Sequence, residues 1–315
     1  MQVNDSRRRI TPRRVLRGAR LAVSDPKSAL RRAADHFASP PDSPVGFPIT
    51  LDYPVTVDAR WGYGRPSHPQ LESLIATGHD QYRSLLEGFR SYLPRLLAIP
   101  VEGDTPGEPT WSNGWFQGLD AATLYGLLAS RNPARYVEVG SGWSTTFTRR
   151  AIRDHGLRTQ VISIDPAPRA DVDGLCDRVI RQPLEQADLS VFDELEAGDI
   201  CFFDGSHYCL PNSDVTVAFL EVLPRLRPGV LVHFHDTFLP WDYLPFFYRR
   251  NYSEQYLLAA MLLAGTRLDV VLPNFYVTRH PSLHQILGEL WTELISYGAN
   301  VNGFSFWVEL REPLG

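Results

Sequence analysis

Lysine is almost absent from this chain of 315 residues, because Lys27 is the only one. A phosphate-binding loop that ends in Gly-Lys-Ser/Thr is therefore excluded. Cysteine is scarce as well. Cys176, Cys201 and Cys209 are odd in number and lack the spacing of a metal-binding motif. This usage of cysteine is typical of a reducing compartment, and we expect a cytoplasmic protein.

Long apolar runs are also lacking. No run approaches the roughly 18 residues that are needed to cross a membrane, and the amino terminus has no apolar stretch of the kind found in secretory signals. We therefore expect no membrane span. A hydrophobic content of 43% and a charged content of 21% are ordinary for a globular protein. The chain is long enough for one large core, with or without an appended cap.

Positive charge is concentrated at the amino terminus. Residues 1–34 hold ten basic and two acidic residues, so the remainder carries −13 within a net charge of −5. Residues 1–44 end in a proline-rich stretch and are predicted to be a solvated basic leader and linker. A basic arm can also contact nucleic acid or an anionic surface. No aromatic–basic recognition motif follows it, so nucleic acid is not expected as a partner.

Residues 45–110 are predicted to form an amino-terminal helical extension, packed on the domain that follows. Apolar residues recur at helical spacing from Pro69 to about Leu97, which predicts one long helix. Residues 111–116 contain two tryptophans and a phenylalanine, and a further helix is expected to run through Leu127. The aromatic cluster fits either a gate over a ligand pocket or a part of the core.

Segments typical of strands and helices alternate from residue 135 onward, which predicts an α/β fold with a mainly parallel sheet between helices. The predicted strands are 135–139, 160–164, 178–181, 199–203, 229–235, 267–272 and 303–310, and the predicted helices lie near 144–155, 186–196, 213–226, 253–264 and 282–296. The last strand alternates in side-chain character, which suits an antiparallel strand with unequal faces.

The segment 135–146 combines a short apolar strand, a turn with two glycines and the start of a helix. The turn, Gly140-Ser141-Gly142, follows the carboxyl end of the strand, where ligands bind in open α/β sheets. Its glycines allow a close approach to a ligand, and the helix start offers unpaired N–H groups. The dinucleotide-binding pattern is incomplete, because Thr145 replaces its third glycine. A tight turn without a ligand stays open as an alternative.

This segment resembles motif I of the class I S-adenosylmethionine-dependent methyltransferases. The resemblance implies S-adenosyl-L-methionine as the cofactor, bound by a domain at residues 111–315. It also implies a Rossmann-like, seven-stranded mixed sheet of strand order 3-2-1-4-5-7-6, with helices on both faces and the last strand antiparallel. The residues expected to contact the cofactor are Glu138, Gly140, Ser141, Gly142, Ser144, Thr145, Asp165, Leu184 and Asp204.

Asp165 follows the second predicted strand, 25 residues after Gly140. A carboxylate at that place can accept both hydroxyl groups of a ribose, and in the methyltransferase family the matching residue holds the adenosine. Leu184 follows the third strand, where the family contacts adenine. Glu138 ends the first strand, and it fits a contact with the charged amino-acid end of the cofactor and a structural role equally well.

Two acidic residues are predicted to meet next to the cofactor. Asp204 follows the fourth strand and Asp236 the fifth, and neighbouring strands lie about 5 Å apart. Converging carboxylates repel unless a proton or a cation lies between them, so we predict a divalent metal held by Asp204, His235 and Asp236. A metal-bound hydroxyl is more acidic than a free one. His207, three residues after Asp204, is placed to take its proton as general base.

The Asp-Gly-Ser-His element at 204–207 and the His235-Asp236 pair resemble the family of macrocin O-methyltransferase and related sugar-modifying enzymes, and more distantly catechol O-methyltransferase. In that group the matching aspartates bind magnesium and the histidine is the base. His235 departs from the pattern, because relatives commonly carry a carboxylate there. A nitrogen ligand weakens the case for magnesium, which is the first expectation, and makes manganese, iron or zinc more plausible. The alternative is that His235 is not a ligand. We expect His233 to be a structural residue.

The predicted function is metal-assisted O-methylation of a small hydroxylated acceptor, such as a sugar or a natural product. An aromatic loop at 238–252 fits acceptor binding, with Asp242 and Arg249 as polar contacts. It fits a hydrophobic cap or a contact between copies equally well, so a homo-oligomer stays open. Two other functions compete. One is metal-independent methylation of nitrogen or of a macromolecule, which the basic leader favours, and the other is cofactor binding without catalysis.

Overall fold

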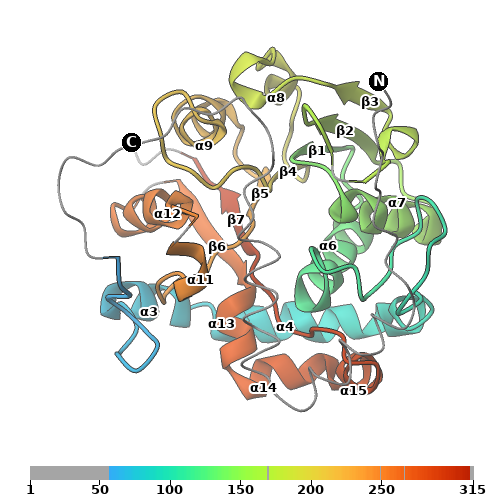
Figure 1. The fold of residues 1–315 in the computed structure, drawn as a ribbon, viewed down its shortest axis with the longest axis horizontal. Coiled ribbons are helices and arrows are strands. Elements are labelled where there is room, and N and C mark those ends of the chain that lie inside the picture. The colour runs from blue at the N-terminus through green and yellow to red at the C-terminus, as the bar shows by residue number, and fades with distance from the viewer. Residues whose placement is uncertain (1–56, 169, 249, 266, 313–315) are drawn as a thin grey trace, which may run out of the picture. The chain divides into compact units, whose positions relative to one another are not determined.

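The computed structural model describes residues 57–312 of the chain, with gaps at residues 169, 249 and 266. The described residues from 59 onward form one compact unit (Figure 1). The predicted basic leader and linker at 1–44 lie outside the described residues. Within the described part, no helix is both long and apolar enough to cross a membrane.

A seven-stranded sheet of order β3-β2-β1-β4-β5-β7-β6 runs through the unit (Figure 1). Neighbouring strands pair in parallel from β3 to β5, and β7 pairs antiparallel with both β5 and β6. The strands are β1 (Arg135–Val139), β2 (Gln160–Ile164), β3 (Arg178–Ile180), β4 (Ile200–Phe203), β5 (Leu231–Phe234), β6 (Leu268–Pro273) and β7 (Phe306–Leu310). The predicted Rossmann-like fold, strand order and antiparallel last strand are confirmed.

The register of the central strands determines which residues share the carboxyl edge of the sheet. Val139 at the end of β1 pairs with Phe203 at the end of β4, and Phe203 pairs with Phe234 at the end of β5. These strands end level with one another, so the residues that directly follow them converge at one edge. The turn after β1, the 204–207 segment and the 235–237 segment thereby become neighbours.

Helices cover both faces of the sheet, with α6 and α7 on one side and α8, α9 and α12 on the other (Figure 1). The α-helices of the described part are α3 (Pro69–Ala76), α4 (His79–Phe89), α5 (Leu93–Leu96), α6 (Gly118–Arg131), α7 (Trp143–His155), α8 (Ser190–Asp193), α9 (Asp214–Val217), α10 (Leu223–Arg225), α11 (Pro245–Tyr248), α12 (Glu254–Leu263), α13 (Asn274–Arg279), α14 (Pro281–His284) and α15 (Gly288–Ser296).

The prediction of one helix over 69–97 is wrong, because the segment is broken into α3, α4 and α5. Gly78 lies at the first break, where a Cβ would lie 2.4 Å from the ring of Tyr82. The hydroxyl of Tyr82 donates a hydrogen bond of 2.8 Å to the carbonyl oxygen of Ile75, near the end of α3. The Tyr82 side chain thus occupies the space at the break and satisfies a helix-end carbonyl, which apolar periodicity cannot reveal.

Two other predicted helices are less regular than the sequence suggests. The helix expected at 186–196 is reduced to α8, since Ser190 N bonds to Asp188 Oδ1 at 3.0 Å and the helix begins only there. The helix expected at 213–226 contains a π-helical segment, Ala218–Val222, just before Pro224. Proline has no N–H to continue an α-helical hydrogen-bond ladder.

One hydrophobic core joins the sheet to the helices on both faces. It includes Phe147 on α7, Phe202 on β4 and Trp307 on β7, all of them fully buried. Tyr82 and Phe89 of α4 belong to the same core. The amino-terminal helices therefore share the core of the sheet through buried aromatic side chains.

Candidate active site

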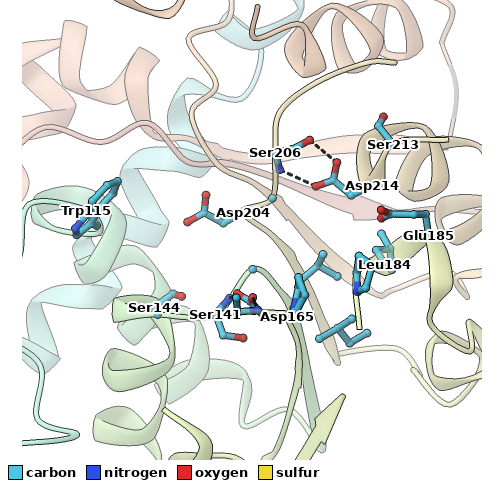
Figure 2. Close-up of a pocket in the computed structure, with 18 of the residues that line it drawn as sticks. Trp115, Ser141, Ser144, Asp165, Leu184, Glu185, Asp204, Ser206, Ser213 and Asp214 are labelled. Carbon is cyan, nitrogen blue, oxygen red and sulfur yellow. Dashed lines mark hydrogen bonds between the residues drawn. The ribbon is translucent and has the colours of Figure 1, made fainter. Parts of the chain in front are cut away.

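A cavity of about 420 Å³ opens at the carboxyl edge of β1, β2, β3 and β4 (Figure 2). β1, β2 and β4 contribute the residues that directly follow them, and β3 contributes residues from the loop that begins three positions after its end. The lining consists of Trp115, Phe116, Val139, Gly140, Ser141, Gly142, Trp143, Ser144, Ile164, Asp165, Pro166, Ala167, Pro183, Leu184, Glu185, Asp204, Gly205, Ser206, Ser213 and Asp214.

The turn after β1 is held tightly against its neighbours. Gly140 has φ of +83°, and a Cβ there would lie 1.9 Å from the carbonyl oxygen of Asp204. No side chain can replace glycine at this position without moving the backbone. Gly140 N donates to Ile164 O at 3.1 Å, and Ser141 N donates to Asp165 Oδ2 at 2.8 Å. The turn is therefore hydrogen-bonded to the end of β2 and packed closely against the residue that follows β4.

Asp165 has both carboxylate oxygens at the cavity and keeps acceptor capacity in each. Oδ2 accepts from Ser141 N, and Oδ1 accepts from Ala167 N at 2.7 Å. Each oxygen has a second lone pair that a ligand hydroxyl can use. Two backbone N–H groups thus aim the carboxylate, and its geometry suits a vicinal diol such as that of a ribose.

Glu138 and Thr145 were predicted to contact the cofactor, but both lie behind the turn and do not line the cavity. Glu138 is fully buried and accepts from Tyr136 Oη at 2.7 Å and from Thr145 Oγ1. Burial raises the pKa of Glu138 to about 7. Thr145 Oγ1 also accepts from Gly142 N at 3.1 Å. The two side chains connect β1 to the start of α7, and they position the turn from behind.

Seven of the nine predicted cofactor residues do line the cavity: Gly140, Ser141, Gly142, Ser144, Asp165, Leu184 and Asp204. Two further acidic residues that sequence reasoning missed, Glu185 and Asp214, line it too. Asp214 accepts from Ser206 N at 2.6 Å, which closes the loop after β4 (Figure 2). Among the described lining residues, carboxylates are the only charged side chains. The cavity is therefore acidic.

A cluster of two histidines and two aspartates lies beside the cavity at the ends of β4 and β5. Asp204 Oδ1 lies 3.4 Å from His207 Nε2 and 3.4 Å from His235 Nδ1. Asp236 contacts the same two nitrogens at 3.7 and 3.8 Å. The side chains of Asp204 and Asp236 are 25% and 18% exposed, whereas those of His207 and His235 are 3% and 6% exposed. The carboxylates thus face the opening and the imidazoles lie behind them.

Each histidine is contacted on its far side by a carboxylate that sequence reasoning missed. His207 Nδ1 lies 2.8 Å from Glu254 Oε2, at the start of α12. His235 Nε2 lies 3.5 Å from Asp120 Oδ2, on α6. An acidic residue in the first turn of a helix is too common to indicate a site. Neither carboxylate follows a strand of the central sheet, so the strand-end argument could not find them.

The pKa values of the cluster reflect these ion pairs. Burial alone would lower the pKa of His207, but the hydrogen bonds to Asp204 and Glu254 raise it to about 10. Burial opposes the charge of His235 as well, yet Asp204 and Asp236 hold its pKa well above the usual range. The two imidazoles in turn hold the pKa of Asp204 well below its usual value against the effect of burial. These ion pairs therefore favour the protonated form of both histidines.

The metal predicted at Asp204, His235 and Asp236 is not supported by the arrangement of the donor atoms. In the part of the chain that the structure describes, no group of three or more His, Cys, Asp or Glu side chains is placed to hold a metal ion. The argument for a metal required positive charge between two converging carboxylates. Protonated His207 and His235 supply that charge, and together they carry as much as a divalent cation.

His233 has the structural role that the sequence suggested. It is fully buried, its Nε2 atom lies 2.7 Å from Ser305 Oγ, and its ring stacks on Phe202 with centroids 3.7 Å apart. Burial and the nearby His235 keep its pKa well below the usual value. His233 is thus a neutral side chain of the core and takes no part in the ion-pair cluster.

The aromatic loop at 238–252 packs on the domain as a second hydrophobic cluster that includes Phe238, Tyr243 and Tyr252. Asp242 was predicted to contact the molecule that receives the methyl group. Its side chain is instead buried, with 3% exposure, and its carboxylate accepts hydrogen bonds from Arg60 N and from the hydroxyl of Tyr256. Residue 249 lies outside the described residues. The loop nevertheless reaches the ion-pair cluster through Tyr252, whose ring lies 4.5 Å from that of His207.

The strand order, the cavity at the strand ends and the aspartate after β2 are typical of α/β proteins that bind nucleoside-type ligands. Comparison with protein families makes this more specific, since residues 137–237 match the family described as a methyltransferase domain. The matched segment runs from β1 to just beyond β5 and includes Asp165, Asp204, His207, His235 and Asp236. It supports an S-adenosylmethionine-dependent methyltransferase.

Solved structures with low similarity to the chain include three methyltransferases. The first is Podospora anserina methyltransferase PaMTH1 bound to SAH (15% identity, 80% of this chain and 100% of that chain covered, TM-score 0.40). The second is a Bacillus cereus O-methyltransferase in complex with SAH (13%, 78% and 96%, TM-score 0.32). The third is Haemonchus contortus phosphoethanolamine N-methyltransferase 2 with SAH (14%, 74% and 60%, TM-score 0.32). Comparison with curated proteins found no significant match.

Proposed function

We propose that this protein transfers the methyl group of S-adenosylmethionine to a hydroxyl oxygen of a small acceptor such as a sugar or a natural product. The methyltransferase-domain match of residues 137–237 supports the cofactor. The choice of oxygen as the acceptor atom rests on His207, a base candidate next to the cofactor cavity. A sugar or natural product is proposed as the acceptor because the 204–207 and 235–236 elements resemble those of sugar-modifying O-methyltransferases.

The acidity of the cavity is the observation that carries the cofactor assignment. Asp165, Glu185, Asp204 and Asp214 line it, and no arginine or lysine is found among its described lining residues. Dinucleotides and nucleoside phosphates carry negative charge, which such a lining repels. A nucleoside with a sulfonium cation and a diol is complementary to it. In this arrangement Asp165 holds the ribose hydroxyls, Leu184 packs on adenine and Asp204 lies at the cationic end.

Bound S-adenosylmethionine supplies an activated methyl group and a neutral thioether as leaving group. The chain must therefore align the acceptor oxygen and remove its proton. His207 Nε2 faces Asp204 and Asp236. After His207 has released its own Nε2 proton to solvent, the neutral imidazole takes the acceptor proton as the C–O bond forms and the S–CH₃ bond breaks. The exposed oxygens of Asp204 and Asp236 accept hydrogen bonds from the acceptor. No step is assigned to a metal ion, since the donor groups of the described residues do not fit one.

Calorimetric titration with S-adenosylhomocysteine tests the cofactor assignment. We expect tight binding by the wild-type protein and about 10- to 100-fold weaker binding by Asp165→Ala, because a charged acceptor of two hydroxyl hydrogen bonds is lost. Asp269→Ala is the matched control, since Asp269 lies on β6 with 60% of its side chain exposed. Absence of binding to well-folded wild-type protein would refute the proposal.

The acceptor atom is tested with radiolabelled S-adenosylmethionine and matched pairs of acceptors that differ only in carrying a hydroxyl or an amine. We expect label in the hydroxylated sugars or phenols, and none in His207→Gln above the level of the uncatalysed reaction. Transfer to the amines alone would leave the cofactor assignment intact and overturn O-methylation.

A further inference from the structure

The start of α12 is hydrogen-bonded to the loop that carries His207. The side chain that would normally cap α12 makes one of these bonds and does not cap the helix. Ser253 is the N-cap residue, yet its hydroxyl makes no capping hydrogen bond to α12. Ser253 Oγ accepts from Cys209 N at 2.9 Å, and Ser253 N donates to the carbonyl oxygen of His207 at 2.9 Å. Serine at an N-cap normally bonds to its own helix, which stabilises the helix by about 1 kcal/mol.

Glu254, the first residue of α12, is likewise directed away from its own helix. Acidic side chains at this position usually interact with the helix N-terminus or with solvent. Glu254 is instead 3% exposed and places Oε2 at 2.8 Å from Nδ1 of His207. Two neighbouring residues therefore hold the same histidine, one through the backbone and the other through the imidazole.

The backbone of His207 is held in an unfavourable conformation. Its φ is +63°, in the left-handed region that residues with a side chain rarely adopt. Such strain persists only where the surroundings enforce it, and it is concentrated at functional sites. The two hydrogen bonds from Ser253 N and Glu254 N to His207 O enforce it here. Tyr252, whose ring lies 4.5 Å away, limits the rotation of the imidazole.

We propose that Glu254 is the positioning residue of the general base: it accepts the Nδ1 proton of His207, so that Nε2 alone faces Asp204, Asp236 and the acceptor. The proposal rests on the proposed methyl transfer by His207. A histidine with a free Nδ1 could present either nitrogen or rotate away, whereas one whose Nδ1–H is bonded to a carboxylate has a defined orientation and a more basic Nε2. Glu254 does not reach the cavity, so it acts only through His207.

The proton between His207 and Glu254 can be observed without knowing the acceptor. In protein labelled with ¹⁵N-histidine and saturated with S-adenosylhomocysteine, we expect a far-downfield, slowly exchanging Nδ1 proton, since both side chains are buried. Its disappearance in His207→Gln assigns it. We expect it to be lost in Glu254→Ala and to persist, less far downfield, in Glu254→Gln, whose amide oxygen can still accept the proton.

Methyl transfer supplies the second readout. We expect kcat to fall about 10- to 100-fold in Glu254→Ala, with a partial recovery in Glu254→Gln and with S-adenosylhomocysteine affinity changed less than about threefold. Asp242→Asn is the matched control. Asp242 is as buried as Glu254 and bonds to Tyr256, also on α12, but it does not contact His207. It should retain both the Nδ1 proton signal and kcat.

The outcomes separate this inference from the proposed function. Wild-type protein that fails to bind S-adenosylhomocysteine would refute the cofactor assignment. Protein that binds it but has no Nδ1 proton assigned to His207 would refute the positioning role of Glu254. The role would also be refuted if Glu254→Ala and Asp242→Asn lowered kcat equally, because the effect would then follow from the packing of α12 alone.

Discussion

Asp120 on α6 lies 3.5 Å from Nε2 of His235, which follows β5, and so connects a helix with the ion-pair cluster. Its carboxylate also accepts hydrogen bonds from the backbone N–H groups of Phe304 and Ser305, at 2.8 Å each, and from Asn274 Nδ2 at 2.8 Å. One buried side chain thus joins α6, the segment before β7, α13 and the cluster. Several hydrogen-bond donors compensate a buried carboxylate for the loss of its contacts with water.

We therefore expect Asp120→Asn to destabilise the fold by about 2–4 kcal/mol, because the new amide N–H group would face donors and the negative charge beside the buried His235 would be lost. Urea unfolding at neutral pH measures the loss. Asp269→Asn, at an exposed position on β6, is the control and should change stability by less than about 0.5 kcal/mol. Equal effects of the two substitutions would show that Asp120 is not an anchor of the cluster.

The fold and the site differ in how far the sequence could predict them. Alternating strand and helix patterns identified all seven strands, and the strand-end rule located Gly140, Asp165 and Asp204 at one cavity. These inferences need only local pattern and the geometry of a parallel sheet. The same inferences could not identify Glu254, because its contact with His207 depends on how α12 packs on the domain and not on any spacing along the chain.

The orientation of Glu138, in contrast, could have been predicted from the strand period. Residues two apart share a face of a strand, so Glu138 points the same way as Tyr136, and the structure joins the two by a hydrogen bond. That face is covered by helices, while the cavity lies beyond the strand end. The predicted metal site is a different case. The strand ends predict that Asp204 and Asp236 converge, but the sequence could not show that two imidazoles contact both carboxylates.

The stability of the protein should fall as the pH rises from about 6.5 to about 10. The pKa of folded His207, about 10, exceeds its ordinary value of 6.5, so the folded state binds this proton more tightly than the unfolded chain does. The resulting stabilisation, on the order of a few kcal/mol, is fully present below pH 6.5 and is lost as the pH rises through 10. The groups that face His207 are Glu254, Asp204, Asp236 and the ring of Tyr252.

Urea unfolding at a series of pH values measures this loss in the wild type and in His207→Gln. Other groups that titrate at alkaline pH are present in both proteins, so the difference between the two curves isolates His207. We expect the alkaline decline to be much smaller in His207→Gln. Parallel curves would mean that His207 is not protonated in the folded protein.

Substitution of Gly140 by alanine should abolish cofactor binding. The added Cβ would lie 1.9 Å from the carbonyl oxygen of Asp204, at a residue with φ of +83°. The turn after β1 must then move away from β4, which displaces Ser141 and the cavity wall and costs about 2–4 kcal/mol of stability. Calorimetry with S-adenosylhomocysteine and urea unfolding measure the two effects.

Gly88→Ala is the control for this substitution. Gly88 lies in α4, and a Cβ there would meet no atom within 4 Å. Because alanine is the better helix former, we expect unchanged cofactor binding and a gain of up to about 1 kcal/mol. Normal cofactor binding by Gly140→Ala would show that the turn is not part of the binding site.

Removal of divalent metal should leave cofactor binding and methyl transfer unchanged. His207 and His235 already neutralise Asp204 and Asp236, and a cation that entered between them would have to displace two protons that raised pKa values hold firmly. We expect the purified protein to contain much less than one transition metal or magnesium ion per chain, and EDTA to change neither the affinity for S-adenosylhomocysteine nor the rate of transfer.

One bound ion per chain that is lost in Asp204→Ala, with activity that EDTA abolishes and manganese or magnesium restores, would contradict this expectation. Such a result would mean that the histidines exchange their protons for a metal, and the same residues would then act as the ligands that the strand ends first suggested.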